Sequence, residues 1–343
     1  MTRREVAVIF NADGALARGG AEDSLAVAGV EGAVRGIVEA LAACGWRARA
    51  IPAPARVRDV PAFVAELDCD AVFNLVESLC GDARNEAHFA AALELRGLPY
   101  TGSGPLALSL CLEKPLARAV LAAAGVPIAR GALLSDGDGS LDGLEYPLLV
   151  KPSREDASHG IALESVARDE AAARARARLV IERYAQPALV EEYIAGREFN
   201  AGLIEGERAG DPPRVLNLSE IDFTGFPAGA PRIVTYGAKW IEGSPEWNGT
   251  RSVAADVDGV LAERIRSAAL GAWRALGLSG YARVDLRVED AHPRRLAVID
   301  VNSNPDLSPD AGFALCAQRS GLSYAQFIES ILEFALRRTP ARA

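Results

Sequence analysis

One stretch near the C-terminal end, residues 280–309, constrains the fold more than any other part of the sequence. It reads GYARVDLRVEDAHPRRLAVIDVNSNPDLSP, and two β-rich runs joined by a polar, proline-containing turn are typical of a hairpin. Arg283 and Asp285 are two positions apart in the first run, as are Asp300 and Asn302 in the second. Residues two apart leave the same face of a strand. Pairing of the two runs would therefore gather a guanidinium, two carboxylates and an amide on one face.

This polar face has two interpretations. Carboxylate and amide oxygens suit a hard cation, and Mg²⁺ is usually held by one or two carboxylates plus substrate phosphates. The alternative is an ordinary polar strand face in solvent. The second run (LAVIDV) is otherwise apolar and is expected to be buried, and a buried carboxylate without a partner is costly. Asp285, Asp300 and Asn302 are therefore candidate metal ligands.

Composition excludes several classes of protein. With 343 residues, half of them hydrophobic, the chain is long enough for two or three lobes. A net charge of −9 without a basic stripe argues against nucleic acid as a partner, and no apolar run reaches membrane-spanning length. The five cysteines are scattered and lack CxxC spacing, which predicts a reduced, cytoplasmic protein.

Lysine is almost absent. Of the 37 basic residues, 34 are arginines and only three are lysines: Lys114, Lys151 and Lys239. Lysine offers a compact point charge with three rotatable donors and commonly binds phosphate in that way. Either these three lysines survive by chance, or they stand where arginine does not serve.

The first part of the chain alternates strands and helices. Strands are expected at residues 5–10, 47–51, 70–75 and 98–101, with helices at 30–44 and 86–95 and a loop over residues 11–28. Such alternation predicts an α/β domain with a small parallel sheet, which we assign to residues 1–108.

Two further lobes are expected after residue 108. Residues 109–199 would form a central lobe, with helices at 113–124 and 169–184 and strands at 147–151, 161–164 and 188–193. Residues 200–343 would form a C-terminal lobe with the hairpin, and strand 198–204 leads into it. Helices are expected at 257–276 and 324–337. A Gly/Pro-rich loop, residues 222–239, is long enough to be a lid.

Two motifs in the central lobe are candidates for nucleotide contacts. Residues 152–160 (PSREDASHG) form a small polar loop after Lys151, and such loops can turn backbone N–H groups toward phosphate. Residues 189–200 (LVEEYIAGREFN) place Glu191 and Glu198 on adjoining segments. That acidic pair could bind an adenine amino group and ribose hydroxyls.

Six motifs in one order resemble those of D-alanine–D-alanine ligases, which belong to the ATP-grasp superfamily. They are TGSG followed by Lys114, YPLLVKPSRE, LVEEYIAGREF, the lysine of YGAKW, ARVD and IDVNSNP. The resemblance covers most of the chain and is clearest over residues 98–305. It implies an ATP-grasp fold with α+β lobes, preceded by a Rossmann-like parallel-sheet domain.

The resemblance also implies roles for individual residues. Lys114, Lys151 and Lys239 would contact ATP phosphates, Lys239 with a catalytic role. Glu191 would meet the adenine amino group, Ile194 would lie beside the purine, and Glu198 would bind the ribose. Asp285, Asp300 and Asn302 would hold two Mg²⁺ ions, for which Mn²⁺ could substitute. The remaining catalytic candidates are Arg283, which would face the reacting carboxylate, and Ser158.

The amino-acid half of the site departs from the family pattern. A characteristic serine before Ser158 is replaced by Ala157, a tyrosine by Trp240, and the histidine of an N-terminal HG motif by Glu77. A glutamate of the N-terminal loop has no clear counterpart. At the acceptor side, a glycine that supplies an oxyanion N–H aligns with Asp306, and a serine that holds the acceptor carboxylate aligns with Ala311.

Glu77, Trp240, Asp306 and Asp310 are therefore the substrate candidates, although Asp310 could instead cap the following helix. The sequence predicts an ATP-dependent carboxylate–amine ligase that acts through an acyl phosphate on small amino-acid or peptide-like substrates, other than two D-alanines. An authentic D-alanine–D-alanine ligase and a non-catalytic nucleotide-binding protein are the alternatives. We expect a cytoplasmic protein, possibly a homodimer.

Overall fold

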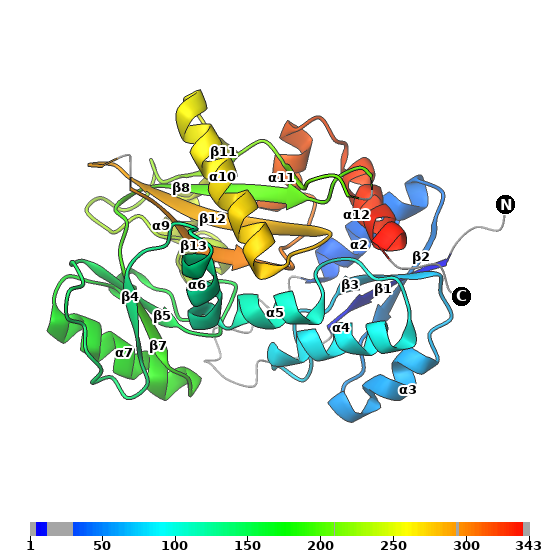
Figure 1. Cartoon of the computed structure of the whole chain (residues 1–343), viewed down its shortest axis with the longest axis horizontal. Coiled ribbons are helices and arrows are strands. Elements are labelled where there is room, and N and C mark those ends of the chain that lie inside the picture. The colour runs from blue at the N-terminus through cyan, green and yellow to red at the C-terminus, as the bar shows by residue number, and fades with distance from the viewer. Residues whose placement is uncertain (1–4, 12–29, 209, 293–294, 339–343) are drawn as a thin grey trace.

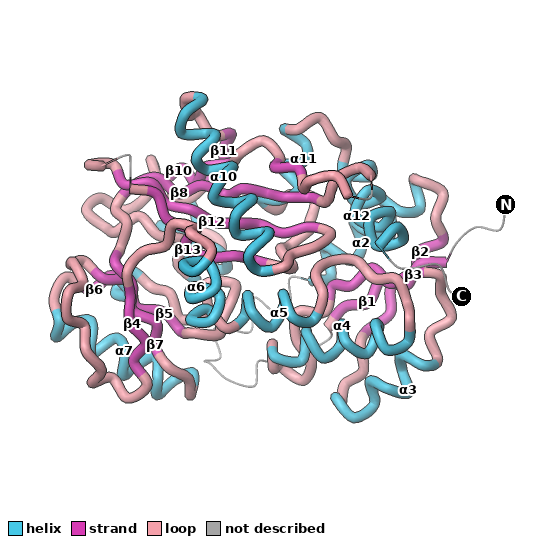
Figure 2. Tube along the Cα trace, in the orientation of Figure 1, coloured by secondary structure: helices cyan, strands magenta, loops and turns pink. Residues whose placement is uncertain are grey.

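The structure is a computed structural model that describes residues 5–11, 30–208, 210–292 and 295–338. Three sheets follow one another along the chain and are packed into one elongated molecule (Figure 1, Figure 2). Most of the loop expected over residues 11–28 lies outside the described residues. Among the described residues, no helix combines the length and the apolar character that crossing a bilayer requires.

The first sheet is parallel, as the sequence predicts. Its strand order is β2-β1-β3, with β1 at Glu5–Phe10, β2 at Arg47–Pro52 and β3 at Ala71–Leu75. Val6 and Val8 pack on one side against α2 (Val30–Ala43) and the C-terminal helix α12 (Tyr324–Arg338), whereas Ala7 and Ile9 face the opposite core. That second core contains α3 (Val60–Ala65) and α4 (Arg84–Arg96). The alternation along β1 is the period of two that a strand buried on both faces requires.

The second sheet, which is formed by the last strands of the chain, is antiparallel. It has the order β11-β10-β8-β12-β13, with β9 also paired to β8. The strands are β8 (Gly196–Ile204), β9 (Arg214–Val215), β10 (Ser219–Asp222), β11 (Arg251–Ala254), β12 (Tyr281–Glu289) and β13 (Leu296–Asn302). Helix α10 (Gly259–Leu276) covers one face, and Val284 and Leu286 of β12 and Phe199 of β8 are buried in the core beneath it. The polar side chains of β8 and β12 consequently lie on the other face.

The third sheet has the order β4-β7-β5-β6, all antiparallel. Its strands are β4 (Gly131–Leu134), β5 (Leu148–Pro152), β6 (Val166–Ala167) and β7 (Ala188–Glu192), and helix α7 (Glu170–Tyr184) packs on it. Asp169 caps α7 by accepting from the backbone N–H of Ala172 at 2.8 Å. Helices α5 (Pro105–Leu112) and α6 (Lys114–Ala123) connect the first sheet to the third.

Several details differ from the sequence-based expectations. Residues 98–101 form only a single parallel bridge, between Tyr100 and Val72. The strand expected at 161–164 is a 3₁₀ turn, Leu163–Ser165, followed by the two-residue strand β6. The sequence analysis also missed α3, α5, β4, β9, β10, β11 and three other short helices: α8 (Tyr236–Trp240), α9 (Pro245–Asn248) and α11 (Gly312–Arg319). All five cysteines are free: Cys111 and Cys316 are buried, Cys44 and Cys69 are partly buried, and Cys80 is exposed.

Candidate functional site

The hairpin at the C-terminal end forms as predicted. Strands β12 and β13 are antiparallel, with Arg283 opposite Asn302 and Asp285 opposite Asp300, and a bulge follows Asp285. All four side chains line a cavity of about 280 Å³ between the polar face of the second sheet and the third sheet. The alternative of a plain solvent-exposed strand face is therefore wrong, because the face is enclosed by another layer of the molecule.

Asp285 is held at the centre of this face. Its two oxygens accept from Arg283 Nε and Nη2 at 2.7 and 2.8 Å, and Asn200 Nδ2 donates to Oδ1 at 2.7 Å. Burial lowers the pKa of Arg283, but the Asp285 carboxylate outweighs burial and raises it above its ordinary value. Arg283 is thus charged, and the hydrogen bonds fix both side chains in orientation.

Lys114 links the hairpin to the polar loop after β5. Its Nζ lies 2.8 Å from Asp156 Oδ1 and 3.3 Å from Asp300 Oδ1. Burial lowers the pKa of Lys114, but the charges of Asp156 and Asp300 outweigh this and raise the pKa above its ordinary value. Burial raises the pKa of Asp300, but the charges of Lys114 and Lys151 outweigh burial and lower the pKa below its ordinary value.

Lys151 links the third sheet to the second. Its Nζ donates to the carbonyl of Ile299 at 3.0 Å and lies 2.7 Å from Glu191 Oε2. Glu191 also forms an ion pair with Arg118, which the sequence analysis did not single out. Lys151 and Glu191 are both almost fully buried, so this charged cluster is held away from bulk solvent.

A second buried ion pair lies on the same wall of the cavity. Glu198 Oε2 is 2.7 Å from Arg287 Nη1. Arg287 also donates to the carbonyls of Ile194 and Gly196, at 2.7 and 2.9 Å, and its guanidinium lies 5.0 Å from the centre of the Tyr193 ring. These contacts fix residues 193–198 against β12.

The loop after β5 and the expected lid are joined by hydrogen bonds. Ser158 Oγ donates to the carbonyl of Val234 at 3.0 Å, and Trp240 Nε1 donates to the carbonyl of Ala157 at 2.8 Å. Ala157 and Ser158 both have positive φ, 54° and 61°, an uncommon conformation for residues other than glycine. These contacts bring Lys239, on α8, to the wall of the cavity. Burial is the main cause that lowers the pKa of Lys239, and the charge of Arg283 lowers it further.

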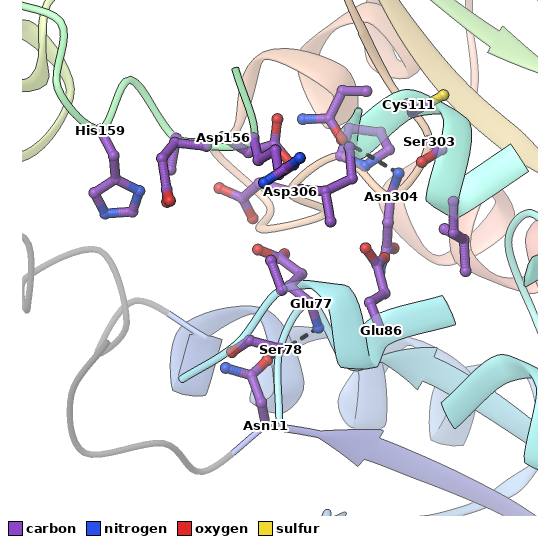
Figure 3. A pocket seen from close by; sticks show the side chains of 18 of the residues that line it. Asn11, Glu77, Ser78, Glu86, Cys111, Asp156, His159, Ser303, Asn304 and Asp306 are labelled. Carbon is purple, nitrogen blue, oxygen red and sulfur yellow. Dashed lines mark hydrogen bonds between the residues drawn. The ribbon is translucent and has the colours of Figure 1, made fainter. Parts of the chain in front are cut away.

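All of the catalytic, nucleotide and metal candidates named from the sequence line the 280 Å³ cavity: Lys114, Lys151, Ser158, Glu191, Ile194, Glu198, Lys239, Arg283, Asp285, Asp300 and Asn302. A second cavity, of about 210 Å³, adjoins it (Figure 3). Both are lined by Asp156, Lys239, Arg283 and Asn302. The two cavities therefore meet at two of the three catalytic candidates, Lys239 and Arg283.

Three of the four substrate candidates, Glu77, Trp240 and Asp306, line the second cavity. Asp310 lines neither cavity and is exposed. It does not cap the following helix either, because the N-cap of α11 is Ala311 and no side chain caps that helix. Neither expectation for Asp310 has support in the structure.

The donor set suits a magnesium ion. Two facing carboxylates, Asp285 and Asp300, and the amide of Asn302 provide oxygen ligands only, which Mg²⁺ prefers and completes with water or phosphate. Among the described residues, no group of three or more His, Cys, Asp or Glu side chains is arranged to hold a metal by itself. Water or phosphate oxygens would therefore have to complete such a site.

Sequence reasoning missed Asn200, Arg287, Arg118, Asp156 and Glu86, all of which line one of the cavities or contact a residue that does. Asn200 is two positions after Glu198, and Arg287 is two after Asp285. Extending the period of two along each strand would have found both. Glu86 carries no such signal, because its helix reaches the site only through tertiary packing.

The fold and the two adjoining cavities define an ATP-grasp ligase, an enzyme that forms carbon–nitrogen bonds. Residues 137–333 match the family model described as "D-ala D-ala ligase C-terminus". The chain belongs to the D-alanine–D-alanine ligase family, whose members use ATP and Mg²⁺.

Individual relatives and solved structures agree with this assignment. A D-alanine–D-alanine ligase of Sinorhizobium fredii is 30% identical over 298 residues, which cover 87% of this chain and 90% of the relative. Protein y4sG of the same organism, which is described as uncharacterized, is 33% identical over 267 residues. These residues cover 78% of this chain and 75% of that protein.

The structure of the Bacillus anthracis D-alanine–D-alanine ligase complexed with ATP has a TM-score of 0.75, at 22% identity and 98% coverage of both chains. The VanG D-Ala:D-Ser ligase of Enterococcus faecalis has a TM-score of 0.70, at 20% identity, covering 97% of this chain and 100% of that one. At these identities the likeness is one of fold, and the expected ATP-grasp fold is confirmed.

Proposed function

We propose that this protein uses ATP to join a carboxylate to an amine through an acyl phosphate, releasing ADP and phosphate. One observation carries the proposal. The residues expected to bind nucleotide and metal line one cavity, and that cavity shares Lys239, Arg283 and Asn302 with a second one. A phosphoryl group and a carboxylate held in adjoining cavities would meet at these shared residues.

The larger cavity would hold ATP. Glu191 and Ile194 would face the base, Glu198 the ribose, and the three lysines the phosphates. When bound, Mg²⁺ would neutralise phosphate charge, and Asp285, Asp300 and Asn302 are the residues that would hold it, as two ions in the full site. The ammonium of Lys114 is within reach of both Asp156 and Asp300. When ATP binds, phosphate contacts would replace part of these two ion pairs.

Two chemical steps would follow. An oxygen of the donor carboxylate attacks the γ-phosphorus, and the β–γ bridging bond breaks to give an acyl phosphate and ADP. A neutral amine then attacks the acyl carbon, its proton leaves to a base, and the C–O bond to phosphate breaks. Arg283, fixed by Asp285, would stabilise the oxyanion of the tetrahedral species, and Lys239 the transferring phosphoryl group.

The substrates would differ from two D-alanines. Ala157 and Trp240 contact one another at the meeting point of loop and lid, where the family pattern has two hydroxyl-bearing residues. Glu77 and Asp306 line the second cavity, where the pattern has a histidine and a glycine. An authentic D-alanine–D-alanine ligase is the alternative. The cytoplasmic location, the homodimer and lobe boundaries at 108 and 199 stay predictions.

Product analysis tests this proposal. The purified protein is incubated with ATP, Mg²⁺ and pairs of amino acids, peptides and amines, and the release of ADP and phosphate is compared with amide products found by mass spectrometry. We expect amide formation with a pair other than two D-alanines. D-Alanyl-D-alanine formation from D-alanine and ATP at about 1 s⁻¹ or faster, the range of dedicated enzymes, would establish the alternative instead.

A further inference from the structure

Arg118, on α6, binds two hydrogen-bond acceptors at one end of the larger cavity. Its Nη1 donates to Glu191 Oε1, and its Nη2 donates to the backbone carbonyl of Ala129 at 2.6 Å. Glu191 and Ala129 both line the cavity of about 280 Å³, whereas Arg118 is not among the described residues that line it. Arg118 therefore stands behind the wall and can act on a ligand only through these two groups.

The position of Arg118 follows from the helix that carries it. Lys114 and Arg118 are four residues apart on α6, so both leave the same face of the helix, about 6 Å apart along its axis. Lys114 lies beside Asp300 at the end expected to hold phosphate, and Arg118 reaches the end expected to hold the base. A Cβ atom at Gly131 would lie 3.1 Å from Arg118 Nη2 and 2.5 Å from the carbonyl oxygen of Val190. Glycine at this position thus leaves room for the guanidinium.

Both acceptor groups are buried and held in place. Glu191 is 3% exposed and Ala129 is 5% exposed. The second carboxylate oxygen of Glu191, Oε2, lies 2.7 Å from Lys151 Nζ. Because the guanidinium of Arg118 is a rigid planar fork, it fixes the Glu191 carboxylate and the Ala129 carbonyl relative to one another.

The two groups can still bind a ligand. A carboxylate offers about four lone-pair sites and a backbone carbonyl offers two. Arg118 and Lys151 use one site on each oxygen of Glu191, and Arg118 uses one site on the Ala129 carbonyl. Each group can therefore accept a further hydrogen bond, and neither can donate one. A ligand that satisfies both needs two N–H donors on one atom.

We propose that Arg118 is a positioning residue that selects adenine, because it presents the Glu191 carboxylate and the Ala129 carbonyl side by side to the 6-amino group. This inference rests on the proposed function, in which this cavity holds ATP. A purine with a 6-oxo group would turn a third acceptor toward these two, and buried polar groups left without a donor cost binding. Arg118 would thus determine which nucleotide is used without touching it.

Calorimetry with two nucleoside diphosphates tests this inference. ADP carries an amino group at purine position 6, inosine diphosphate carries an oxo group there, and neither has a γ-phosphate to lose. Each is titrated with Mg²⁺ into the full-length protein. We expect the wild type to bind ADP at least about tenfold more tightly, since a hydrogen bond to a charged group is worth that much or more. Equal binding of the two nucleotides would overturn the inference.

The variant Arg118→Met separates positioning from general support of the fold. Methionine approximates the length of the arginine stem but donates no hydrogen bond. We expect ADP binding to weaken about tenfold and inosine diphosphate binding to stay within about twofold, so that the preference is lost. A purely structural role would weaken both nucleotides alike. An unchanged preference for ADP, or equal weakening of both nucleotides, would overturn the inference.

The variant Arg118→Lys keeps the inference testable if the methionine variant does not fold, because it keeps a positive charge beside the buried Glu191. One ammonium cannot reproduce the fork that binds both groups. We expect the midpoint of thermal unfolding to stay within a few degrees, while the preference for ADP falls at least about threefold. Full preference in this variant would show that charge alone suffices and would overturn the inference.

Arg174→Met is the matched control. Arg174 lies on α7 in the same lobe and also binds a glutamate and backbone carbonyls, those of Glu170, Gly137 and Gly139. It is not among the described residues that line either cavity. Both affinities should be unchanged in this variant, and a loss of the ADP preference here as well would overturn the inference.

Binding of ADP by the wild type separates the two ideas. If ADP binds and its preference does not depend on Arg118, the inference fails and the proposed function stands. If the wild type binds neither nucleotide, the proposed function fails, and this inference fails with it.

Discussion

The indole Nε1 of Trp240 donates to the backbone carbonyl of Ala157 across 2.8 Å, and this bond joins helix α8, at the end of the expected lid, to the loop after β5. Both residues replace hydroxyl-bearing ones of the family pattern. Ala157 brings no side-chain donor of its own, and the larger indole reaches its backbone instead. The two departures therefore meet in one contact, and they are best understood together.

Removing that contact should loosen the lid. Trp240→Phe keeps an aromatic ring but leaves the Ala157 carbonyl without its donor, a change worth about 0.5–1.5 kcal/mol. We expect the KM for ATP to rise about two- to tenfold, and proteolysis within residues 222–240 to become faster.

Two comparisons complete this experiment. Trp247→Phe is the matched control, because the Trp247 side chain is 40% exposed on the neighbouring helix α9. Since lids commonly order over their substrates, a non-hydrolysable ATP analogue should protect residues 222–239 from protease. Equal cleavage with and without the analogue would count against a lid.

The metal assignment predicts loss of ATP turnover. Asp300→Ala or Asn302→Ala removes an oxygen ligand from the hairpin face, and charge neutralisation in phosphoryl transfer is lost with it. We expect turnover to fall by at least about 10³-fold, measured as ADP release, while the midpoint of thermal unfolding stays within a few degrees. Near-normal turnover in both variants would refute the assignment.

Lys151 should not tolerate arginine. Its Nζ fits between the Ile299 carbonyl and Glu191, at 3.0 and 2.7 Å, and the side chain is 6% exposed. A planar guanidinium is larger and directs its donors differently. Lys151→Arg should therefore raise the KM for ATP about tenfold or more although the charge is kept. If KM and kcat are unchanged, arginine serves at this position, and the survival of the three lysines is explained by chance.

Much of this site could be predicted because its residues follow local rules. The period of two along β12 and β13 placed Arg283, Asp285, Asp300 and Asn302 on one face. Helix α10 was predicted from its apolar periodicity, and the parallel first sheet from its strand–helix alternation. These features depend on a few neighbouring residues, so the sequence alone carries them.

The remainder depends on contacts between distant segments. Glu86 reaches the second cavity because α4 packs beside the first sheet, and it then meets Asn304, 218 positions away. Strand β4 reads as an ordinary short segment, and it forms because β7 offers it an edge. Residues 161–164 look like a strand, but the Ile161 carbonyl accepts from the distant Tyr236 N–H, and Leu163–Ser165 form a 3₁₀ turn.

Arg287 should be important for stability as well as for the nucleotide cavity. It is 3% exposed and pairs with Glu198, which is 7% exposed. Arg287→Met would leave a buried carboxylate unpaired, and we expect the free energy of unfolding to fall by about 3–5 kcal/mol. The double variant Arg287→Met/Glu198→Gln should recover part of that loss in denaturant titrations. No recovery would show that the Ile194 and Gly196 carbonyls, not the ion pair, account for the loss.

The raised pKa of Glu77 predicts how stability depends on pH. Its ordinary pKa is 4.5. Glu77 is accessible to solvent where it lines the second cavity, but desolvation by the surrounding protein raises its pKa to about 7, with Asp306 and Asp156 adding to the shift and Lys239 opposing it. Folding therefore favours the protonated carboxyl. The resulting stabilisation is complete below pH 4.5 and is lost as the pH rises through 7. Glu77→Gln cannot ionise, so its unfolding temperature relative to wild type should be higher at pH 8 than at pH 5. A difference between the two proteins that stays constant from pH 5 to pH 8 would show that Glu77 ionises normally, with Lys239 as a sufficient partner.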